Sequence, residues 1–438
     1  MMKLSPRRRD DVINALRRGT VPQQGLDVLA VGLDRFELYF DEELGQVKQG
    51  GAGFKALQGE YGSGKTFASR WVCERAKRAG FVTSEVQISE TETPLHRHET
   101  VYRRIMERLS TSAQQFGAFQ SILDQWFYTL EQDVEKEGVA QGSDAFESRV
   151  RVLLDQRLGE ATRVSPIFAQ VVRAVRVAAA AGDDELARGL VAWLSGQPNV
   201  AASIKRRADI KGDIDHDGAL QMLAGLLTVI RDCGLSGLVV VLDEVETLQR
   251  VRSDVREKGL NALRGLLDEI ASGRFPGLYL VITGTPAFYT GPEGVQRLAP
   301  LAQRMHTDFR NDPAFDNPRA PRIRLSAFDF DSLLALGSKV RDIYADGAKV
   351  ADRVRMKCDD RFIADLSRGI AGQFGDKPSV SPRLFLKKLI DMLDGVDQHE
   401  AFDPRRDGSL RLSNAELTDQ ERAAIGRNDV DDIEIQLP

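Results

Sequence analysis

The sequence predicts an α/β protein with a parallel β-sheet core, a large α-helical insertion and a C-terminal helical lid. Two apolar runs, Leu238–Leu242 and Leu278–Thr283, have the composition of strands that are covered on both faces. A glycine-rich turn follows the short apolar segment Phe54–Gln58, and a helical pattern follows the turn. From about residue 90 to residue 230 the apolar residues recur at helical spacing, so helices interrupt the series of strands.

The composition is that of a globular protein with a large core. The 438 residues suit two or three structural units, and 42% of them are hydrophobic and 29% charged. The formal net charge is −5, so any contact with nucleic acid has to come from a local basic patch. Cys73, Cys233 and Cys358 lie far apart, and this spacing argues against a zinc site or a disulfide framework.

A cytoplasmic location is expected. The first residues are basic but lead into no apolar segment of the kind that signal peptides have. The strongly apolar run Leu238–Leu242 is far too short to cross a bilayer. We therefore expect no contact with a membrane.

The sequence divides into five expected regions. Residues 1–50 should form an N-terminal helical segment leading into the core, and residues 51–110 together with 217–328 should form the core itself. The expected strands are Phe54–Gln58, Phe81–Ile88, Leu238–Leu242, Leu278–Thr283 and Arg322–Leu325. The remaining regions are the helical insertion 111–216, the helical lid 329–395 and the polar tail 396–438. The insertion helices have a plainer interpretation as packing layers for the core.

One segment carries the P-loop (Walker A) pattern GxxxxGK[ST] in full. It reads Gly59-Glu60-Tyr61-Gly62-Ser63-Gly64-Lys65-Thr66. Glycines allow several backbone N–H groups to point at one anion, and the following helix adds its positive dipole end. Lys65 is expected to face the β- and γ-phosphates of ATP, and the Thr66 hydroxyl to ligate Mg²⁺. The alternative is a chance glycine-rich turn, which the preceding strand and the following helix disfavour.

A second motif, of the Walker B type, ends the apolar run Leu238–Leu242. Asp243 and Glu244 follow it directly, at the sheet edge where open α/β sheets bind ligands. Asp243 is expected to hold Mg²⁺ through its water shell, and Glu244 to orient and polarise the attacking water as a general base. Glu246 is interpreted as a solvated helix residue rather than a second base.

Thr283 ends the next apolar run. A strand that ends in a small polar residue would place this hydroxyl between the two motif strands, next to the γ-phosphate. The alternative is a threonine that simply precedes the turn Gly284-Thr285-Pro286.

The order of these motifs resembles that of the AAA+ ATPases, a branch of the ASCE P-loop class, over residues 25–395. The resemblance implies that Thr283 is a sensor 1 residue and that Arg383 is a sensor 2 residue in the lid. The segment Gly294–Arg304 is predicted to be one helix, and the resemblance implies an arginine finger in it, at Arg297 or Arg304, which would reach the γ-phosphate of a neighbouring subunit. A nucleotide-dependent homo-oligomer is therefore expected. The alternative for each arginine is a surface or salt-bridge role.

A closer resemblance is to the ATP-binding proteins of BREX-type bacterial phage-defence systems, specifically the D component. The segments that carry it are Arg8–Ile13, Arg17–Pro22, Val31–Asp34, Gly59–Thr66, Gly284–Pro286 and Gly294–Leu298. The resemblance implies antiviral defence against foreign DNA, beside a helicase or another DNA-processing partner. The chain departs from the origin-recognition branch of AAA+ proteins because no winged-helix pattern follows the lid, which argues against direct recognition of duplex DNA.

Two functional hypotheses remain open on the sequence alone. The first is an oligomeric ATPase that hydrolyses ATP and remodels or loads a partner, and the intact Glu244 favours it. The second is a nucleotide-gated scaffold that recruits a partner with little turnover, which the size of the helical insertion keeps open. DNA binding would use a local basic patch such as Arg7-Arg8-Arg9 or Lys205-Arg206-Arg207, although charge runs are commonly solvated faces.

Overall fold

The computed structural model describes residues 4–371 and 382–408, and its core is a parallel β-sheet. The strands are β1 (Gly53–Gln58), β2 (Val82–Gln87), β3 (Leu238–Asp243), β4 (Leu278–Gly284) and β5 (Arg322–Arg324). They form one five-stranded sheet in the order β2-β3-β4-β1-β5, and every pairing is parallel. The predicted α/β class is confirmed, and each strand overlaps its predicted range.

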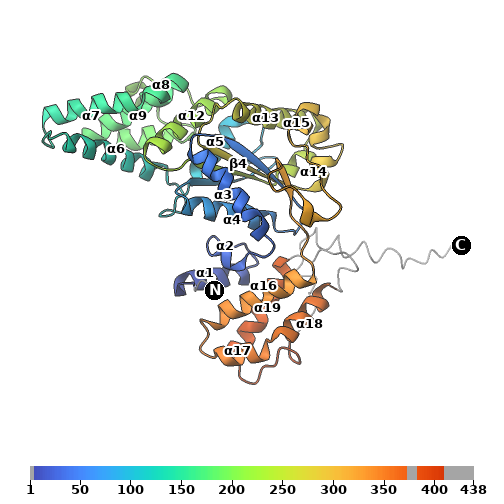
Figure 1. Cartoon of the computed structure of the whole chain (residues 1–438). Coiled ribbons are helices and arrows are strands. Elements are labelled where there is room, and N and C mark those ends of the chain that lie inside the picture. Colours follow the sequence, from blue (N-terminus) through green and yellow to red (C-terminus); the bar gives the residue numbers. More distant parts are fainter. Residues whose placement is uncertain (1–3, 372–381, 409–438) are drawn as a thin grey trace.

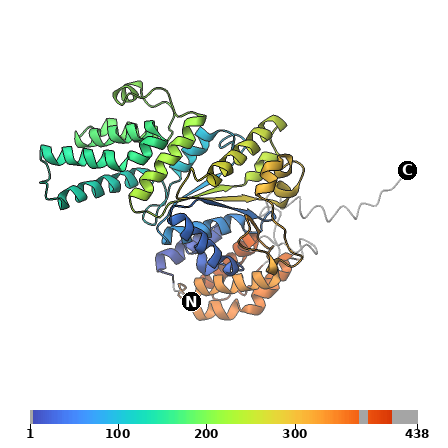
Figure 2. The ribbon, with the colours of Figure 1, turned by 45° about the horizontal axis from the view of Figure 1, so that its top comes forward.

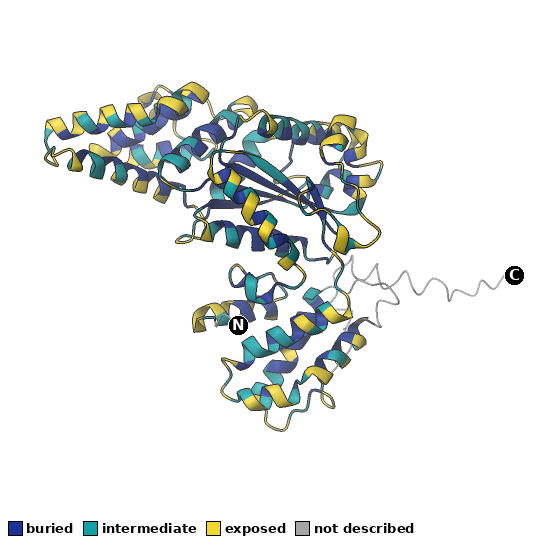
Figure 3. Cartoon of the chain, in the orientation of Figure 1, coloured by how far each residue is buried: buried dark blue, intermediate teal, exposed yellow. Residues whose placement is uncertain are grey.

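Alternate residues of the strands pack against helices on opposite faces of the sheet. Val239 and Val241 of β3 lie in one apolar cluster, while Val240 and Leu242 lie in another. The first face is covered by α3 (Asp34–Lys48) and α4 (Lys65–Arg78). The second face is covered by α5 (His98–Glu107), α12 (His216–Asp232) and α13 (Ser253–Ala271). Figure 3 shows the strands as the most continuously buried part of the chain. Burial on both faces explains why these strands are uninterrupted apolar runs.

The chain between α5 and α12 forms a helical arm without a strand of the sheet. Its helices are α6 (Phe119–Lys136), α7 (Asp144–Arg157), α8 (Gly159–Val164), α9 (Pro166–Ala180), α10 (Asp184–Leu194) and α11 (Ala202–Arg207). In Figure 1, α6, α7 and α9 project from the core. Trp126, Phe168 and Trp193 join the arm to the apolar cluster of the second sheet face. The arm therefore shares the apolar cluster of the core, while α6, α7 and α9 extend away from the sheet.

Four helices near the end of the chain form a separate layer, the C-terminal helical unit. They are α16 (Phe330–Ala345), α17 (Ala351–Lys357), α18 (Asp360–Ala371) and α19 (Pro382–Gln398). The first helix of the chain, α1 (Pro6–Arg17), packs in this unit rather than on the sheet (Figures 1 and 2). Val12, Ile13 and Leu16 share its apolar cluster, and Arg17 donates two hydrogen bonds of 2.7 Å to Asp394.

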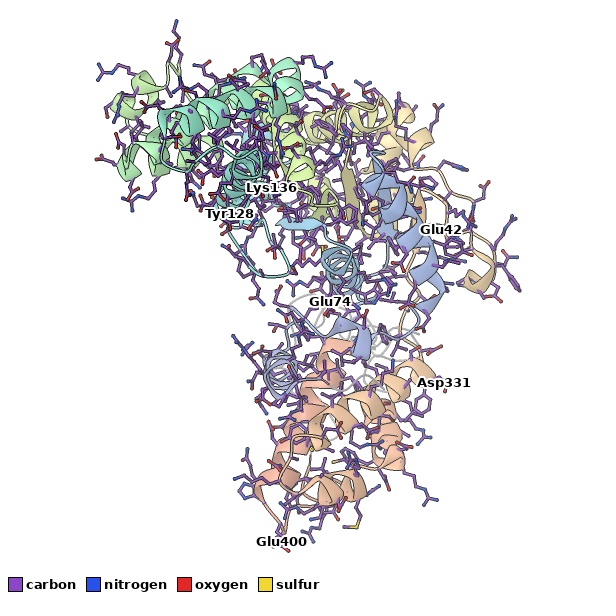
Figure 4. The ribbon with its side chains drawn as sticks, turned by 60° about the vertical axis from the view of Figure 1, so that its left-hand side comes forward. Glu42, Glu74, Tyr128, Lys136, Asp331 and Glu400 are labelled. Carbon is purple, nitrogen blue, oxygen red and sulfur yellow. The ribbon has the colours of Figure 1, made fainter. Side chains whose placement is uncertain are left out.

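A short segment links α1 back to the core. It contains α2 (Leu26–Leu29), whose first N–H groups are held by a residue of α4. The Glu74 carboxylate accepts the N–H groups of Gly25 at 2.9 Å and Leu26 at 2.7 Å. Figure 4 shows Glu74 where the N-terminal segment meets the core. This contact fixes the segment beside the helix that follows the P-loop.

One helix boundary differs from the predicted one in a way that matters for the candidate site. The predicted helix Gly294–Arg304 is split into a 3-10 turn, η2 (Val295–Arg297), and the short helix α15 (Ala299–Arg304). Leu298 between them is extended, with φ −122° and ψ 92°, and Pro300 enters the first turn of α15, where a missing N–H is tolerated. Arg297 and Arg304 therefore lie on different elements.

The other elements of the described residues are short and helical. They are η1 (Val245–Gln249), α14 (Pro286–Thr290) and η3 (Pro313–Phe315). Helix α19 continues to Gln398, beyond the predicted lid boundary at residue 395, and residues 409–438 of the predicted tail lie outside the described residues. Within the described part of the chain, no helix combines the length and the apolar character needed to cross a membrane.

Candidate nucleotide-binding site

The turn Gly59–Thr66 connects β1 to α4 and has the geometry of an anion cradle. A Cβ atom on Gly59 would lie 2.1 Å from Ser63 Oγ, so a larger residue there would displace the Ser63 hydroxyl from the loop. Gly64 has φ +85°, which favours glycine, and it directly precedes α4. The loop therefore ends at a helix N-terminus, where N–H groups and the helix dipole favour an anion. Within the described structure the buried Ser63 hydroxyl has no hydrogen-bond partner, which leaves a donor for a phosphate oxygen.

Asp243, at the carboxyl end of β3, joins three parts of the site. Thr66 Oγ1 donates a hydrogen bond to Asp243 Oδ2 at 3.0 Å, and Thr283 Oγ1 donates to Asp243 Oδ1. The backbone N–H of Glu244 donates to Thr283 Oγ1 at 3.1 Å. The pairing of β3 with β4 and the proximity of α4 make these contacts possible. Asp243 thus links, through hydrogen bonds, residues that were predicted from three separate motifs.

Glu244 has a left-handed backbone and a side-chain partner that the sequence analysis missed. Its φ of 61° and ψ of 41° are uncommon for a residue with a side chain, and such outliers cluster at functional sites. Gln87 Nε2 donates a hydrogen bond to Glu244 Oε2 at 2.8 Å. Gln87 is the last residue of β2 and lies opposite Asp243 in the pairing of β2 with β3. A polar residue at the end of a predicted strand was the only signal for it in the sequence.

Lys65 is buried, and its ammonium group contacts three oxygen atoms of the protein. Its Nζ donates to the carbonyl oxygens of Gly59 at 3.0 Å and Glu60 at 3.3 Å, and it pairs with Glu246 Oε1 at 3.6 Å. The Glu246 side chain is 13% exposed, and burial raises the pKa of its carboxyl group, although Lys65 opposes this rise. The interpretation of Glu246 as a solvated residue is therefore wrong. The left-handed turn at Glu244 directs η1 back into the site, which the sequence pattern did not indicate.

A cavity of about 250 Å³ adjoins the P-loop and extends to the C-terminal helical unit. Its polar wall includes Lys65, Thr66, Glu244 and Glu246, and Arg383 of α19 also lines it. Its apolar wall is built from the N-terminal segment, α4 and the C-terminal helical unit, namely Leu16, Val21, Pro22, Leu29, Phe67, Phe328, Leu336 and Leu386. Arg383 packs against Gly19 of the N-terminal segment.

Arg297 and Arg304 do not line this cavity. Arg297 is hydrogen-bonded to Ser253 Oγ at 3.3 Å and is 3.4 Å from Glu293 Oε2. Arg304 pairs with Asp268 and donates to the carbonyl oxygen of Pro300 at 3.4 Å. Both side chains remain 37% exposed. Within one chain, the two arginines are therefore held by local partners at the surface.

The oxygen donors at Thr66 and Asp243 fit Mg²⁺ bound together with a nucleotide. The part of the chain that the structure describes contains no group of three or more His, Cys, Asp or Glu residues that could hold a metal. The hydroxyl of Thr66 and the carboxylate of Asp243 are nevertheless 3.0 Å apart beside the P-loop. Mg²⁺ is typically held by one or two protein oxygens, with waters and substrate phosphates completing its shell.

The two basic runs are partly neutralised. Arg7 and Arg8 of α1 are exposed, whereas Arg9 bonds to the carbonyl oxygen of Asp346 at 3.3 Å. In the second run Lys205 pairs with Asp213 at 3.1 Å and Arg207 with Asp183 at 2.7 Å. The Lys205 side chain is mostly buried, at 17% exposed, whereas Arg207 is 56% exposed.

Comparison with known proteins places the chain in a family. A comparison with the curated proteins finds no relative. The family model described as "BREX system ATP-binding protein BrxC/D" matches residues 4–411. The match spans α1, the P-loop, the helical arm and the C-terminal helical unit, and it confirms the resemblance to BREX ATP-binding proteins. On this match over nearly its whole length, the chain belongs to the family of BREX system ATP-binding proteins BrxC/D.

Proposed function

We propose that this BREX protein is an AAA+-type ATPase that hydrolyses Mg²⁺-bound ATP. The observation that carries the proposal is the position of Asp243, whose carboxylate is hydrogen-bonded to the hydroxyls of Thr66 and Thr283 beside Glu244. A phosphate-binding turn, a magnesium ligand and a candidate base are the parts that phosphoryl transfer to water requires. Here they meet at one edge of the sheet.

Each residue has a distinct role in this proposal. The N–H groups of the turn Gly59–Thr66 and the Lys65 ammonium bind the β- and γ-phosphates. Mg²⁺, held by Thr66 and Asp243, neutralises charge on the phosphates when it is bound. Glu244 accepts the proton of the attacking water as general base. Thr283 orients Asp243 with its hydroxyl and fixes the backbone of Glu244 with its oxygen.

The arrangement of the layers supports the AAA+ assignment. The strand order β2-β3-β4-β1-β5 puts the P-loop strand β1 beside β4 rather than beside β3, and the C-terminal helical unit lies across the cavity. The proposed division is a core at residues 51–110 and 217–328, an insertion at 111–216 and a lid at 329–395. The apolar wall of the cavity suits the base of the nucleotide, and Arg383 reaches the phosphates as a sensor 2 residue.

The wider role follows from family membership. The protein acts in bacterial defence against phage or foreign DNA, in the cytoplasm, with a helicase or another DNA-processing protein as partner. Arg297 or Arg304 serves as an arginine finger in a nucleotide-dependent homo-oligomer. The proposed contacts with DNA are the basic runs Arg7-Arg8-Arg9 and Lys205-Arg206-Arg207. Both the arginine contacts and the DNA contacts require the exposed local ion pairs to be exchanged, which costs little at a surface.

A second function is favoured by a specific contact. Because Gln87 donates a hydrogen bond to the Glu244 carboxylate, one oxygen of the candidate base is already occupied in the isolated chain. A nucleotide-gated scaffold with little turnover would use the same fold to recruit a partner. The helical arm offers a surface for this, with the exposed side chains Tyr128 and Lys136 on α6 (Figure 4).

One experiment separates the two functions. ATP turnover is measured with and without DNA, alongside the molecular mass in solution with and without nucleotide. The ATPase function predicts turnover that the Lys65→Ala variant loses together with nucleotide affinity, because a cation facing the phosphates is removed. Binding that depends on Lys65 without turnover under any of these conditions favours the scaffold. Equal binding of ATP by the wild type and Lys65→Ala would contradict the nucleotide site itself.

A further inference from the structure

The contact between Lys65 and Glu246 joins the P-loop to a residue that the catalytic scheme does not use. Glu246 lies on η1, and its Oε1 is 3.6 Å from Lys65 Nζ. The ammonium group also has the carbonyl oxygens of Gly59 and Glu60 as acceptors, at 3.0 and 3.3 Å. An ammonium has three N–H donors, and two of them donate to these carbonyl oxygens, while Glu246 adds an ion pair beyond hydrogen-bonding distance. A phosphate oxygen that approaches Lys65 therefore competes with the charge of Glu246.

Glu246 is the partner whose displacement by phosphate is most favourable. Its second oxygen, Oε2, is buried and has no hydrogen-bond partner among the described residues. Burial raises the pKa of its carboxyl group, and the nearby carboxylates of Asp243 and Glu244 act in the same direction. Lys65 therefore compensates only one of the two Glu246 oxygens, and a buried carboxylate needs hydrogen bonds to both oxygens to be stable. The backbone carbonyls of Gly59 and Glu60, in contrast, belong to the turn itself.

The charge of Glu246 also opposes the ligand directly. Glu246, Glu244 and Lys65 line the same cavity, so a terminal phosphate beside Lys65 comes close to both carboxylates. Mg²⁺ bound at Asp243 offsets one carboxylate, and Glu244 has a role in proton transfer. Glu246 has Lys65 as its compensating charge, and that is the charge the phosphate engages, so the phosphate and Glu246 repel each other at short range in a partly buried site.

We propose that Glu246 is a positioning residue that competes with phosphate for Lys65 and thereby lowers the affinity for ATP more than the affinity for ADP. This inference rests on the proposed nucleotide-binding function. Lys65 faces the β- and γ-phosphates, so the γ-phosphate of ATP carries the additional negative charge that Glu246 repels. The residue therefore sets how much ATP is needed to load the site.

The test is a graded pair of variants, Glu246→Gln and Glu246→Asp, in the full chain. Glu246→Gln removes the charge at nearly constant volume, and we expect ATP to bind about tenfold more tightly, equivalent to about 1.4 kcal/mol. ADP affinity should rise less. Glu246→Asp draws the carboxylate back from Lys65, and ATP affinity should rise by a smaller factor. Titration with a fluorescent ATP analogue and with ADP as competitor gives both values.

Steady-state kinetics give a readout that a merely structural role would not move. If Glu246 opposes ground state and transition state alike, Glu246→Gln lowers KM while kcat stays within about twofold. A thermal melt of the variant without nucleotide checks folding. If Glu246→Gln does not fold, the intermediate affinity expected of Glu246→Asp remains a direct test.

An acid–base pair whose base lies on the same helix as Lys65 serves as the control. Arg70 of α4 pairs with Glu85 at 2.9 Å, and Glu85→Gln should leave ATP and ADP affinities unchanged. Unchanged ATP affinity in Glu246→Gln, or equal gains for ATP and ADP, would overturn the inference. That result, with ATP binding still dependent on Lys65, would leave the nucleotide-binding function standing.

Discussion

Gln87 and Glu244 are joined by a 2.8 Å hydrogen bond from the Gln87 amide to the Glu244 carboxylate, across the ends of β2 and β3. A hydrogen bond to a charged group contributes about 1.5–3 kcal/mol. In this chain the bond engages one oxygen of the residue that we assign as the general base. The attacking water and the Gln87 amide therefore compete for the same Glu244 carboxylate.

Removing this hydrogen bond should speed up hydrolysis. We expect Gln87→Ala to raise kcat about tenfold, a change of about 1.4 kcal/mol in the barrier, with little effect on ATP affinity. Steady-state ATP turnover measures the effect. Gln249→Ala is the control, because the Gln249 amide bonds to the carbonyl oxygen of Ala287 at 3.2 Å instead. A slower Gln87→Ala enzyme would mean that Gln87 orients the base productively.

Glu244→Gln tests the base itself. The amide keeps the size of the side chain but cannot accept a proton at neutral pH, so kcat should fall by about 10²-fold or more. ATP binding should persist, since the Glu244 side chain is hydrogen-bonded to Gln87 and its backbone N–H to Thr283, neither of which lies in the P-loop turn. Turnover and nucleotide titration on the same preparation decide the matter. Near-normal turnover would remove Glu244 from the mechanism.

Thr283→Val tests the link between the two motif strands. Valine fills the same volume but lacks the hydroxyl that donates to Asp243 and accepts from the N–H of Glu244. Leaving these buried groups unpaired should cost about 1–3 kcal/mol in the free energy of unfolding. Turnover should fall, and more Mg²⁺ should be needed for half-maximal rate. Denaturant titration and Mg²⁺ dependence measure the two effects. Thr290→Val, at an exposed position, should change neither.

Assembly provides the fourth prediction. ATP should raise the molecular mass in solution, and activity per molecule should rise with protein concentration, because a trans arginine contributes about 10³-fold in related phosphoryl-transfer systems. Arg297→Ala or Arg304→Ala should abolish this concentration dependence and leave ATP binding intact. Arg319→Ala is the control, since Arg319 is an exposed arginine paired with Glu42 at 2.8 Å. A wild-type protein that stays monomeric with ATP and works equally well when diluted would rule out trans activation.

The parts of the site that the sequence predicted are those carried by contiguous segments. The turn Gly59–Thr66 and the pair Asp243 and Glu244 each sit at the end of a strand, so the neighbours along the chain fix their orientation. Thr283 required one further step, the placement of its strand end at the same sheet edge as Asp243, which the rule for parallel strand ends supplied. The direct pairing of β3 with β4 is known only from the structure.

Gln87 and Glu246 could not be found in this way. Gln87 is brought to Glu244 by the register of β2 against β3, and a single sequence does not encode which strands are neighbours. Glu246 enters the site because Glu244 adopts a left-handed conformation, which reverses the direction expected for a residue three positions after a strand. The position of α1 in the C-terminal helical unit is likewise a long-range contact, invisible to local periodicity.

That position of α1 determines the order in which the molecule can be completed during synthesis. The apolar face formed by Val12, Ile13 and Leu16 leaves the ribosome early, yet its partners in α16 and α19 are translated only after the core and the arm. Nascent domains generally fold as they emerge, and an unpaired apolar surface in that interval is prone to misassociation. The P-loop is therefore present on the growing chain long before the wall formed by Phe328, Leu336 and Leu386 exists. A nucleotide at the P-loop can therefore be enclosed only after the segments that carry these three residues have been translated.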